Sequence, residues 1–461
     1  MKKPIITFEN FTFQYRAQAK PTLKNINLTI YEGEKVLIVG PSGSGKSTLS
    51  HCINGLVPFY YEGQITGSLK LSGRETKSMS IAEISHQVGT VLQDPDSQFI
   101  GLTVAEDIAF KLENDCMIQK TMQDKVEAVS KIVDINSHLE NEPHHLSGGQ
   151  KQRVTLAGVM VDDVEILLFD EPLASLDPAT GKTAIELIDR LKNENNKTII
   201  IIEHRLEDVL HASVDRIIVV DDGCIISDNR PEELLASKLL TETGIREPLY
   251  ITALKYAGCE VTADSMPQHI QTLQIEHYKH QLAAWLKAAS EKKEKVYQEA
   301  ILEFDKISFG YSSRKEILHD VSFKVYKGEM LSIVGKNGAG KSTLSKLICG
   351  FYKPNSGEIL FKGKDLAGSS IKERSEKIGM IMQNPNQMIS KPMIFEEVAL
   401  GLKVRGVPEE EINRRVDKAL KVCGLYPFRN WPVSALSFGQ KKRVTVASIL
   451  VLDPEIIILD E

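Results

Sequence analysis

Two nine-residue stretches with the pattern GxxxxGK[ST] constrain this chain more than any other feature of its sequence. The first consists of Gly40, Pro41, Ser42, Gly43, Ser44, Gly45, Lys46, Ser47 and Thr48. The second consists of Gly335, Lys336, Asn337, Gly338, Ala339, Gly340, Lys341, Ser342 and Thr343. A short apolar run precedes each copy, at residues 36–39 and 331–334, and a helix-like stretch follows. We therefore expect a strand–loop–helix at both places, which is the context that gives the pattern its meaning.

A loop of this kind suits the binding of phosphate groups. Glycines let the backbone N–H groups approach closely and adopt positive φ, and the following helix adds its positive N-terminal end. Lys46 and Lys341 can then reach the β- and γ-phosphates, and Ser47 and Ser342 can ligate Mg²⁺. The competing interpretation, a glycine-rich turn with a surface lysine, does not account for two copies behind apolar runs.

The same order of segments occurs twice along the chain, which indicates a tandem duplication. In each half we expect a P-loop NTPase domain of the α/β class, with a mainly parallel sheet core and an antiparallel β addition. Alternating residues at 5–13 and 25–30 predict the antiparallel strands. Near-continuous apolar runs predict parallel strands buried on both faces, at residues 166–169, 198–202 and 217–220. The predicted division is a first domain at 1–240, a largely helical linker at 241–300 and a second domain at 301–461.

Helical and irregular segments are expected between these strands. Residues 103–140 have a helical pattern, and Thr103 and Glu106 have capping-box spacing at its start. A further helix is expected after Ser147, and another over residues 269–299. Residues 58–80 are rich in Gly and Ser and favour a loop.

Composition excludes several classes of protein. The 461 residues carry 56 basic and 62 acidic side chains, a net charge of −6, and show no basic stripe of the kind that binds nucleic acid. Six widely spaced cysteines without a CxxC pair argue against a zinc site or a disulfide framework. No apolar run approaches the roughly 18 residues of a membrane span. We expect a protein that meets a membrane only through its partners.

Further motifs follow the first loop in a fixed order: Gln93, the string LSGGQ at 146–150, the acidic end of an apolar run at 166–171, the aspartate of Ser-Leu-Asp at 175–177, and His204. Together with the loop, this set resembles the ATP-binding subunit of ABC transporters, over nearly the whole chain and twice. The resemblance implies an ATPase with ABC-type domains, each with a helical subdomain that carries the signature string.

The resemblance also implies a role for each matching residue. Glu171 and Glu461 would act as general bases, His204 would contact the γ-phosphate, and Asp177 would couple the two sites. Asp170, Asp460, Ser47 and Ser342 would hold Mg²⁺, with Gln93 and Gln383 touching the metal and the attacking water. Tyr15 and Tyr311 would stack on adenine. The signature residues would close over ATP bound to the other domain; they are Ser147, Gly148, Gly149, Gln150, Ser437, Gly439 and Gln440.

The second half departs from the family pattern in two ways. Phe438 stands where the first signature has Gly148, so the two sites should be unequal. The sequence also stops at Glu461, without counterparts of Asp177 and His204. We expect the second domain to be truncated after the Asp460–Glu461 pair.

The strings QDPDSQF at 93–99 and QNPNQM at 383–388 resemble the ATPases of energy-coupling-factor importers. The fused two-domain form resembles the hydroxymethylpyrimidine/thiamine import ATPase of bacilli. The resemblance implies import of a vitamin or related small molecule, such as a thiamine precursor, or of a transition-metal ion. It further implies a transmembrane coupling subunit, a membrane-embedded substrate-binding subunit, and a peripheral location on the cytoplasmic face of the membrane. The two halves would pair with each other or with a second copy, and Gln98 and Phe99 would contribute to docking.

Two other functions remain open from the sequence. The alternative is a soluble twin-ABC ATPase that acts on ribosomes or nucleic acid, which the negative net charge and the short linker disfavour. A regulator that does not hydrolyse ATP conflicts with the presence of both Glu171 and Glu461.

Overall fold

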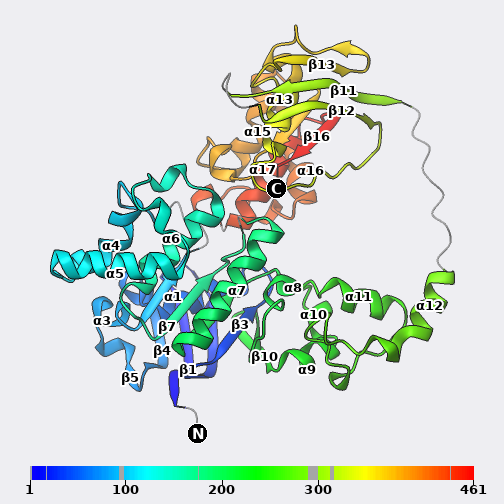
Figure 1. Cartoon of the computed structure of the whole chain (residues 1–461). Coiled ribbons are helices and arrows are strands. Elements are labelled where there is room, and N and C mark those ends of the chain that lie inside the picture. The colour runs from blue at the N-terminus through cyan, green and yellow to red at the C-terminus, as the bar shows by residue number, and fades with distance from the viewer. Residues whose placement is uncertain are drawn as a thin grey trace. The chain divides into compact units, whose positions relative to one another are not determined.

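The structure, a computed structural model, describes residues 3–16, 18–92, 98–174, 176–288, 299–311, 316–436 and 438–460 (Figure 1). The chain forms two compact units, residues 1–291 and residues 292–461. Each unit has its own hydrophobic clusters. Among the described helices, none is at once long enough and apolar enough to cross a membrane.

The first unit contains two sheets. The antiparallel sheet has the strand order β2-β1-β4-β5, and the six-stranded sheet has the order β10-β9-β3-β8-β7-β6. In the larger sheet β10 is antiparallel to β9 and the other pairs are parallel. The strands are β1 (Pro4–Tyr15), β2 (Leu23–Tyr31), β3 (Lys35–Val39), β4 (Gly63–Leu71), β5 (Arg74–Glu75), β6 (Val88–Val91), β7 (Ile166–Asp170), β8 (Thr198–Ile202), β9 (Arg216–Asp221) and β10 (Cys224–Asn229).

The six-stranded sheet is covered on both faces, as its apolar runs predict. On β7, Leu167 and Phe169 belong to one buried cluster, whereas Ile166 and Leu168 belong to the other. The first cluster includes side chains of α4 to α7, and the second includes side chains of β1, β2, β4 and α1. Because successive residues of a strand point to opposite faces, the sheet lies between α4 to α7 on one face and the antiparallel sheet with α1 on the other.

Helices of the first unit follow the strands in an alternating order typical of α/β domains. They are α1 (Lys46–Ile53), α2 (Leu56–Phe59), α3 (Ile81–Ser85), α4 (Val104–Asn114), α5 (Gln119–Ile132), α6 (Gly148–Met160), α7 (Pro178–Asn195), α8 (Leu206–Val209), α9 (Pro231–Ala236), α10 (Leu239–Glu242), α11 (Leu249–Tyr256) and α12 (Lys279–Ala288). The capping box of Thr103 and Glu106 is confirmed at the start of α4. The predicted helical stretch at 103–140 is two helices, since Cys116 between them has a φ of 54°.

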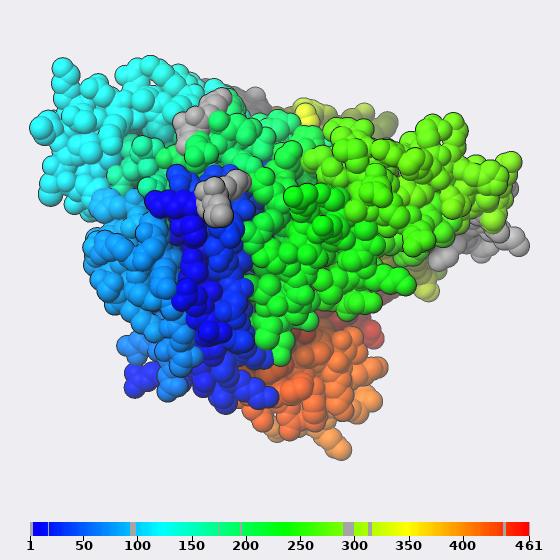
Figure 2. Space-filling view, turned by 90° about the horizontal axis from the view of Figure 1, so that it is seen from below, coloured from blue at the N-terminus to red at the C-terminus, as the bar shows by residue number. Residues whose placement is uncertain are grey.

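The space-filling view shows how the antiparallel sheet joins its neighbours. In Figure 2 the residues of β1 and β2 (blue) lie between the segment that contains β4 (light blue) and the segment that contains β9 and β10 (green). β1 pairs with β4 on one side. On the other side Lys24 of β2 forms an ion pair of 2.6 Å with Asp222, in the turn between β9 and β10.

The second unit repeats the first in part. Its antiparallel sheet has the order β12-β11-β13-β14, and β15 pairs in parallel with β16. Its elements are β11 (Ala300–Phe309), β12 (Leu318–Tyr326), α13 (Lys341–Cys349), β13 (Ser356–Phe361), β14 (Lys364–Asp365), α14 (Ile371–Ser375), β15 (Ile378–Ile381), α15 (Ile394–Val404), α16 (Glu409–Val422), α17 (Phe438–Leu450) and β16 (Ile456–Leu459).

The predicted strand at residues 331–334 is wrong for this structure. In the first unit β3 is paired on both sides, with β8 and β9. Among the described residues of the second unit, no strand pairs with 331–334, and Val334 is 86% exposed. Without a neighbouring strand in the described part of the chain, the backbone N–H and C=O groups of this run form no ladder hydrogen bonds, so the run is not part of a sheet.

Two further predictions are corrected. The loop predicted at 58–80 contains β4. The glycines of this strand suggested a loop, and most of its residues are exposed or only partly buried. The helix predicted at 269–299 is shorter, because α12 begins at Lys279 and a short 3-10 turn (Ile275–Tyr278) precedes it. Residues 289–298 lie outside the described residues.

Candidate nucleotide-binding sites

The first glycine-rich loop connects β3 to α1, and the N-terminal end of α1 faces the loop. Gly45 is the N-cap of α1 with a φ of 107°, and it provides no side-chain cap for the first-turn N–H groups. The ammonium group of Lys46 donates to the carbonyl oxygens of Gly40 at 2.8 Å and Pro41 at 2.9 Å, so it lies over the loop. The N–H groups and the lysine therefore converge on one place, as phosphate binding requires.

At Gly40 this loop leaves no room for a larger side chain, and its polar groups fit a phosphate. A Cβ added at Gly40 would lie 2.1 Å from the carbonyl oxygen of Val220 and 2.7 Å from Oγ of Ser44. Among the described residues, the buried Oγ of Ser44 has no hydrogen-bond partner. A hydroxyl of this kind fits a loop whose partner is a ligand oxygen. The donor set, with a lysine and a helix N-terminus, matches a polyphosphate.

Acidic residues end β7 beside the loop. Asp170 is buried, and burial together with the neighbouring Glu171 raises its pKa to about 6. Burial lowers the pKa of Lys46, against the opposing influence of Glu171 and Asp170. His204, after β8, places its Nε2 2.9 Å from Oε1 of Glu171. The structure thus gathers four of the predicted site residues at the carboxyl end of the parallel sheet, where ligands of α/β folds bind.

Tyr15 lies at the end of β1 and contacts the same loop. Its hydroxyl group lies 3.0 Å from Oγ1 of Thr48 in the first turn of α1. Its ring packs edge-on against Phe13 and Tyr61, with centroids 4.7 and 6.0 Å away. The tyrosine is therefore held next to the phosphate loop by both its ring and its hydroxyl.

The second unit repeats these contacts. Lys341 donates to the carbonyl oxygens of Gly335 at 2.8 Å and Lys336 at 3.1 Å. The hydroxyl of Tyr311 lies 3.0 Å from Oγ1 of Thr343, although this tyrosine is 52% exposed.

In the second unit, two residues that the sequence predicts as magnesium ligands form a hydrogen bond with each other. Ser342 donates to Oδ1 of Asp460 at 2.9 Å, so two residues far apart in the sequence meet where the metal is predicted. Asp460 follows β16 directly.

The signature segment lies at the start of α6. Ser147 and Gln150 form a capping box there, and Gln150 Nε2 lies 2.9 Å from Nε2 of His138. A Cβ at Gly149 would lie 2.6 Å from Cγ2 of Thr180 on α7, so the close approach of α6 and α7 requires a glycine. Asp177 caps α7 by accepting from the N–H groups of Ala179 and Thr180.

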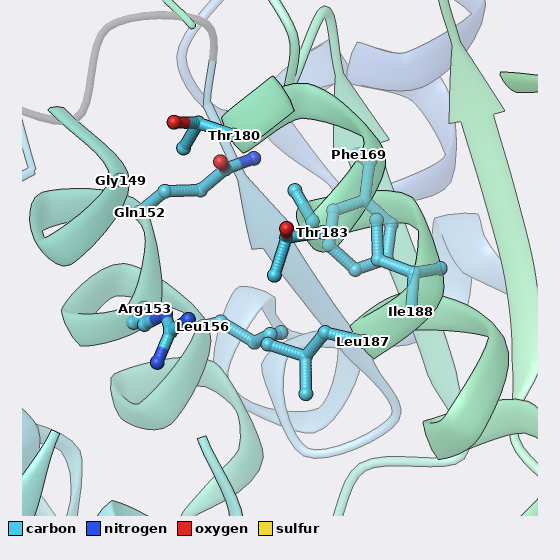
Figure 3. Close-up of a pocket in the computed structure, with 10 residues that line it drawn as sticks. Gly149, Gln152, Arg153, Leu156, Phe169, Thr180, Thr183, Leu187 and Ile188 are labelled. Atoms are coloured by element: carbon cyan, nitrogen blue, oxygen red, sulfur yellow. The ribbon is translucent and has the colours of Figure 1, made fainter. Parts of the chain in front are cut away.

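A small cavity of about 30 Å³ lies between α6 and α7 (Figure 3). Its walls include Gln152, Leu156, Phe169 and Leu187, and Thr183 also lines it. The cavity can hold a water-sized group but is far too small for a nucleotide. We assign it no ligand.

Three predicted residues are not described by the structure, and two others lie in the second unit. Gln93, Ser437 and Glu461 lie outside the described residues. Gln383 is exposed two residues after β15, and Gln440 lies in the first turn of α17.

The structure adds new contacts for a predicted docking residue, Gln98, and one residue that the sequence interpretation missed, Glu203. The side chain of Gln98 bridges back to β6, where its Oε1 accepts from Leu92 N at 2.9 Å and its Nε2 donates to Thr90 O at 3.1 Å. Glu203, next to His204, is only 2% exposed. The sequence did contain a signal for Glu203, because it is a charged residue between a buried strand and a candidate histidine.

Comparison with known proteins identifies the family. The family described as ABC transporter matches residues 23–174 and 318–461, and the family described as ATP-binding cassette cobalt transporter matches residues 237–309. An ABC transporter ATP-binding protein of Clostridium perfringens is 64% identical over 460 residues, which cover 100% of this chain and 81% of that relative. A relative in Enterococcus faecalis with the same description is 59% identical over 462 residues, covering 100% of this chain and 81% of the relative.

A solved structure of cbiO1 from Clostridium perfringens, described as part of the ABC transporter complex cbiONQ, has a TM-score of 0.48 and 29% identity to this chain. It covers 55% of this chain and 100% of its own. The alignments with the two relatives extend over the whole of this chain and therefore over the motifs discussed above. This chain belongs to the ABC transporter family as an ATP-binding protein with two ATPase domains.

Proposed function

We propose that this ATPase binds MgATP at each glycine-rich loop and hydrolyses it to energise import through a transporter of the energy-coupling-factor type. The observation that supports this most is the convergence of Lys46, Asp170, Glu171 and His204 at one end of the parallel sheet, beside a helix start without a side-chain cap. In this proposal residues 1–240 and 301–461 are the two ATPase domains, and residues 241–300 connect them.

The residues of the first site divide the work of phosphoryl transfer. Lys46 and the loop N–H groups neutralise charge on the phosphates, and the ring of Tyr15 offers a face to adenine. Glu171 accepts hydrogen bonds from the attacking water and orients it, while His204 contacts the γ-phosphate. Catalysis of this kind rests on positioning and charge stabilisation rather than on covalent chemistry.

Magnesium fits the same site. Ser47 and Asp170 would hold the ion in the first unit together with Gln93, and Ser342 and Asp460 would hold it in the second together with Gln383. The ion supplies charge neutralisation between the β- and γ-phosphates. The 2.9 Å contact between Ser342 and Asp460 supports the pairing of hydroxyl and carboxylate.

The importer assignment comes from the family. The match of residues 237–309 to a cobalt transporter family favours a transport ATPase over the ribosome-acting alternative. The partners proposed are a transmembrane coupling subunit and a membrane-embedded substrate-binding subunit, which would hold this chain at the cytoplasmic face of the membrane. The cargo classes proposed are a transition-metal ion and a vitamin or related small molecule such as a thiamine precursor.

Uptake in cells tests this proposal. Cells that lack the chromosomal copy would receive the wild-type chain or the Lys46→Ala variant, and uptake of labelled Co²⁺ and of labelled hydroxymethylpyrimidine would be compared. The wild-type chain should restore uptake of one cargo, and Lys46→Ala should restore neither. Equal restoration by both chains would contradict the role of the first site.

A further inference from the structure

Glu171, the proposed general base, begins a turn with unusual backbone geometry. Its φ is 51°, in the left-handed region that non-glycine residues rarely occupy. Its N–H donates to Ile202 O at 2.8 Å, and Ala174 N–H donates to Glu171 O at 3.2 Å. Conformations of this kind persist only where the surroundings hold them, so the residues that hold this turn matter for catalysis.

The turn is held by a buried carboxylate from the next strand. Oε2 of Glu203 accepts the N–H of Leu173 at 3.1 Å. Oε1 of Glu203 accepts the N–H groups of His204 at 2.8 Å and Arg205 at 3.2 Å. One side chain, 2% exposed, therefore joins the turn that starts with Glu171 to the segment that carries His204.

Arg205 holds the same turn from its carbonyl side. Its Nη1 donates to the carbonyl oxygens of Leu173 at 2.8 Å and Leu176 at 3.1 Å. Both backbone groups of Leu173 are thus bound by residues 203 and 205. Gln152 of α6 adds a contact of 2.7 Å to Pro172 O.

We propose that Glu203 is a positioning residue for ATP hydrolysis, which fixes Glu171 and His204 relative to each other through the backbone. It acts through backbone hydrogen bonds and is not itself catalytic. The inference rests on the proposed roles of Glu171 and His204. A carboxylate is required because each of its oxygens is an acceptor, whereas a glutamine offers one oxygen and one N–H₂ group. In Glu203→Gln, the side-chain N–H₂ group must therefore face either the N–H of Leu173 or the N–H groups of residues 204 and 205, and these donors lose their acceptor.

Amide hydrogen exchange of the full chain tests these hydrogen bonds independently of ATPase activity. Glu203→Gln should increase the exchange rates of the amides of residues 173 and 174 or of residues 203–206 by about tenfold or more, and leave those of β7 unchanged. Glu207→Gln is the matched control, because the exposed carboxylate of Glu207 also accepts a backbone N–H, from Leu249 at 3.0 Å, but on α11. Wild-type exchange at both segments in Glu203→Gln would overturn the proposal.

Kinetics separate positioning from a general structural role. In a Lys341→Ala background, which leaves only the first site to bind nucleotide, Glu203→Gln should lower kcat for ATP by about 10- to 100-fold while KM and the Kd for ATP stay within about twofold, and Glu207→Gln should change none of these. A parallel loss of ATP affinity, or an unchanged kcat, would overturn the proposal. If Glu171→Gln alone hydrolyses ATP at the wild-type rate, the base assignment fails, whereas the exchange pattern of Glu203→Gln still tests the backbone arrangement by itself.

Discussion

His204 Nε2 lies 2.9 Å from Oε1 of Glu171, although the two residues come from the ends of different strands. β7 and β8 pair in parallel register, with Asp170 opposite Ile202, so the residues that follow each strand emerge side by side. The contact is therefore a consequence of sheet topology. It puts a carboxylate and an imidazole next to the phosphate loop.

Replacing Tyr15 distinguishes a stacking role from a hydrogen-bonding role. Tyr15→Phe removes the 3.0 Å contact with Thr48 and keeps the ring, so the affinity for ATP should fall by no more than about threefold. Tyr15→Ala removes the ring and should weaken ATP binding by about tenfold or more, since stacking on a base contributes about 1–3 kcal/mol. Equilibrium binding of a fluorescent ATP analogue measures both. Equal losses in the two variants would show that the ring is not the adenine platform.

Gln98 should affect hydrolysis as well as docking. Its carboxamide bridges Leu92 and Thr90, and Leu92 directly precedes Gln93. Loss of this bridge in Gln98→Ala should reduce kcat by about tenfold, equivalent to about 1.4 kcal/mol. Steady-state ATPase assays with purified chain measure the change.

Gln98→Met is the control, because the second unit uses a methionine at the corresponding place. There Met388 Sδ accepts from Met382 N at 3.1 Å. Gln98→Met should therefore retain more activity than Gln98→Ala. An alanine variant with wild-type kcat would restrict Gln98 to docking.

Lys35 should be important for stability. Its side chain is fully buried and pairs with Asp189 at 3.0 Å. Lys35→Met should lower the free energy of unfolding by about 3 kcal/mol, near the lower end for breaking a buried pair, because Asp189 keeps some contact with water. Urea denaturation of the full chain followed by circular dichroism measures this.

A surface pair provides the comparison for Lys35. Lys131 and Glu127 are both exposed, at 61% and 62%, so Lys131→Ala should cost less than about 1 kcal/mol. Equal effects of the two substitutions would mean that the buried pair adds nothing.

Local patterns in the sequence predicted the parts of the site that depend on local geometry. The loop at 40–48 and the acidic end of β7 occupy the predicted places, because a motif on a strand–loop–helix carries its own geometry. The parallel strands were predictable from their apolar runs, since burial on both faces leaves no polar positions.

Features that depend on distant residues were not predictable. β4 was missed because its glycines suggested a loop. Gly67 has a φ of 78°, and a Cβ there would lie 2.3 Å from Asn10 O. This glycine therefore marks a bulge in the pairing of β4 with β1. Residues 331–334 show the reverse case, in which a strand-like run lacks pairing partners among the described residues. The contact of Glu203 with Leu173 joins residues 30 apart. No local spacing indicates such a contact.

The most direct test of the central claim is ATP hydrolysis by the Glu171→Gln variant in a Lys341→Ala background, so that only the first site binds nucleotide. ATP affinity should stay within about twofold of the Lys341→Ala parent, because the loop and Lys46 are unchanged. The rate of hydrolysis should fall by about 10²- to 10⁴-fold, the usual contribution of a general base. Hydrolysis at the rate of the parent, with ATP bound, would contradict the assignment of Glu171 and with it the proposed site.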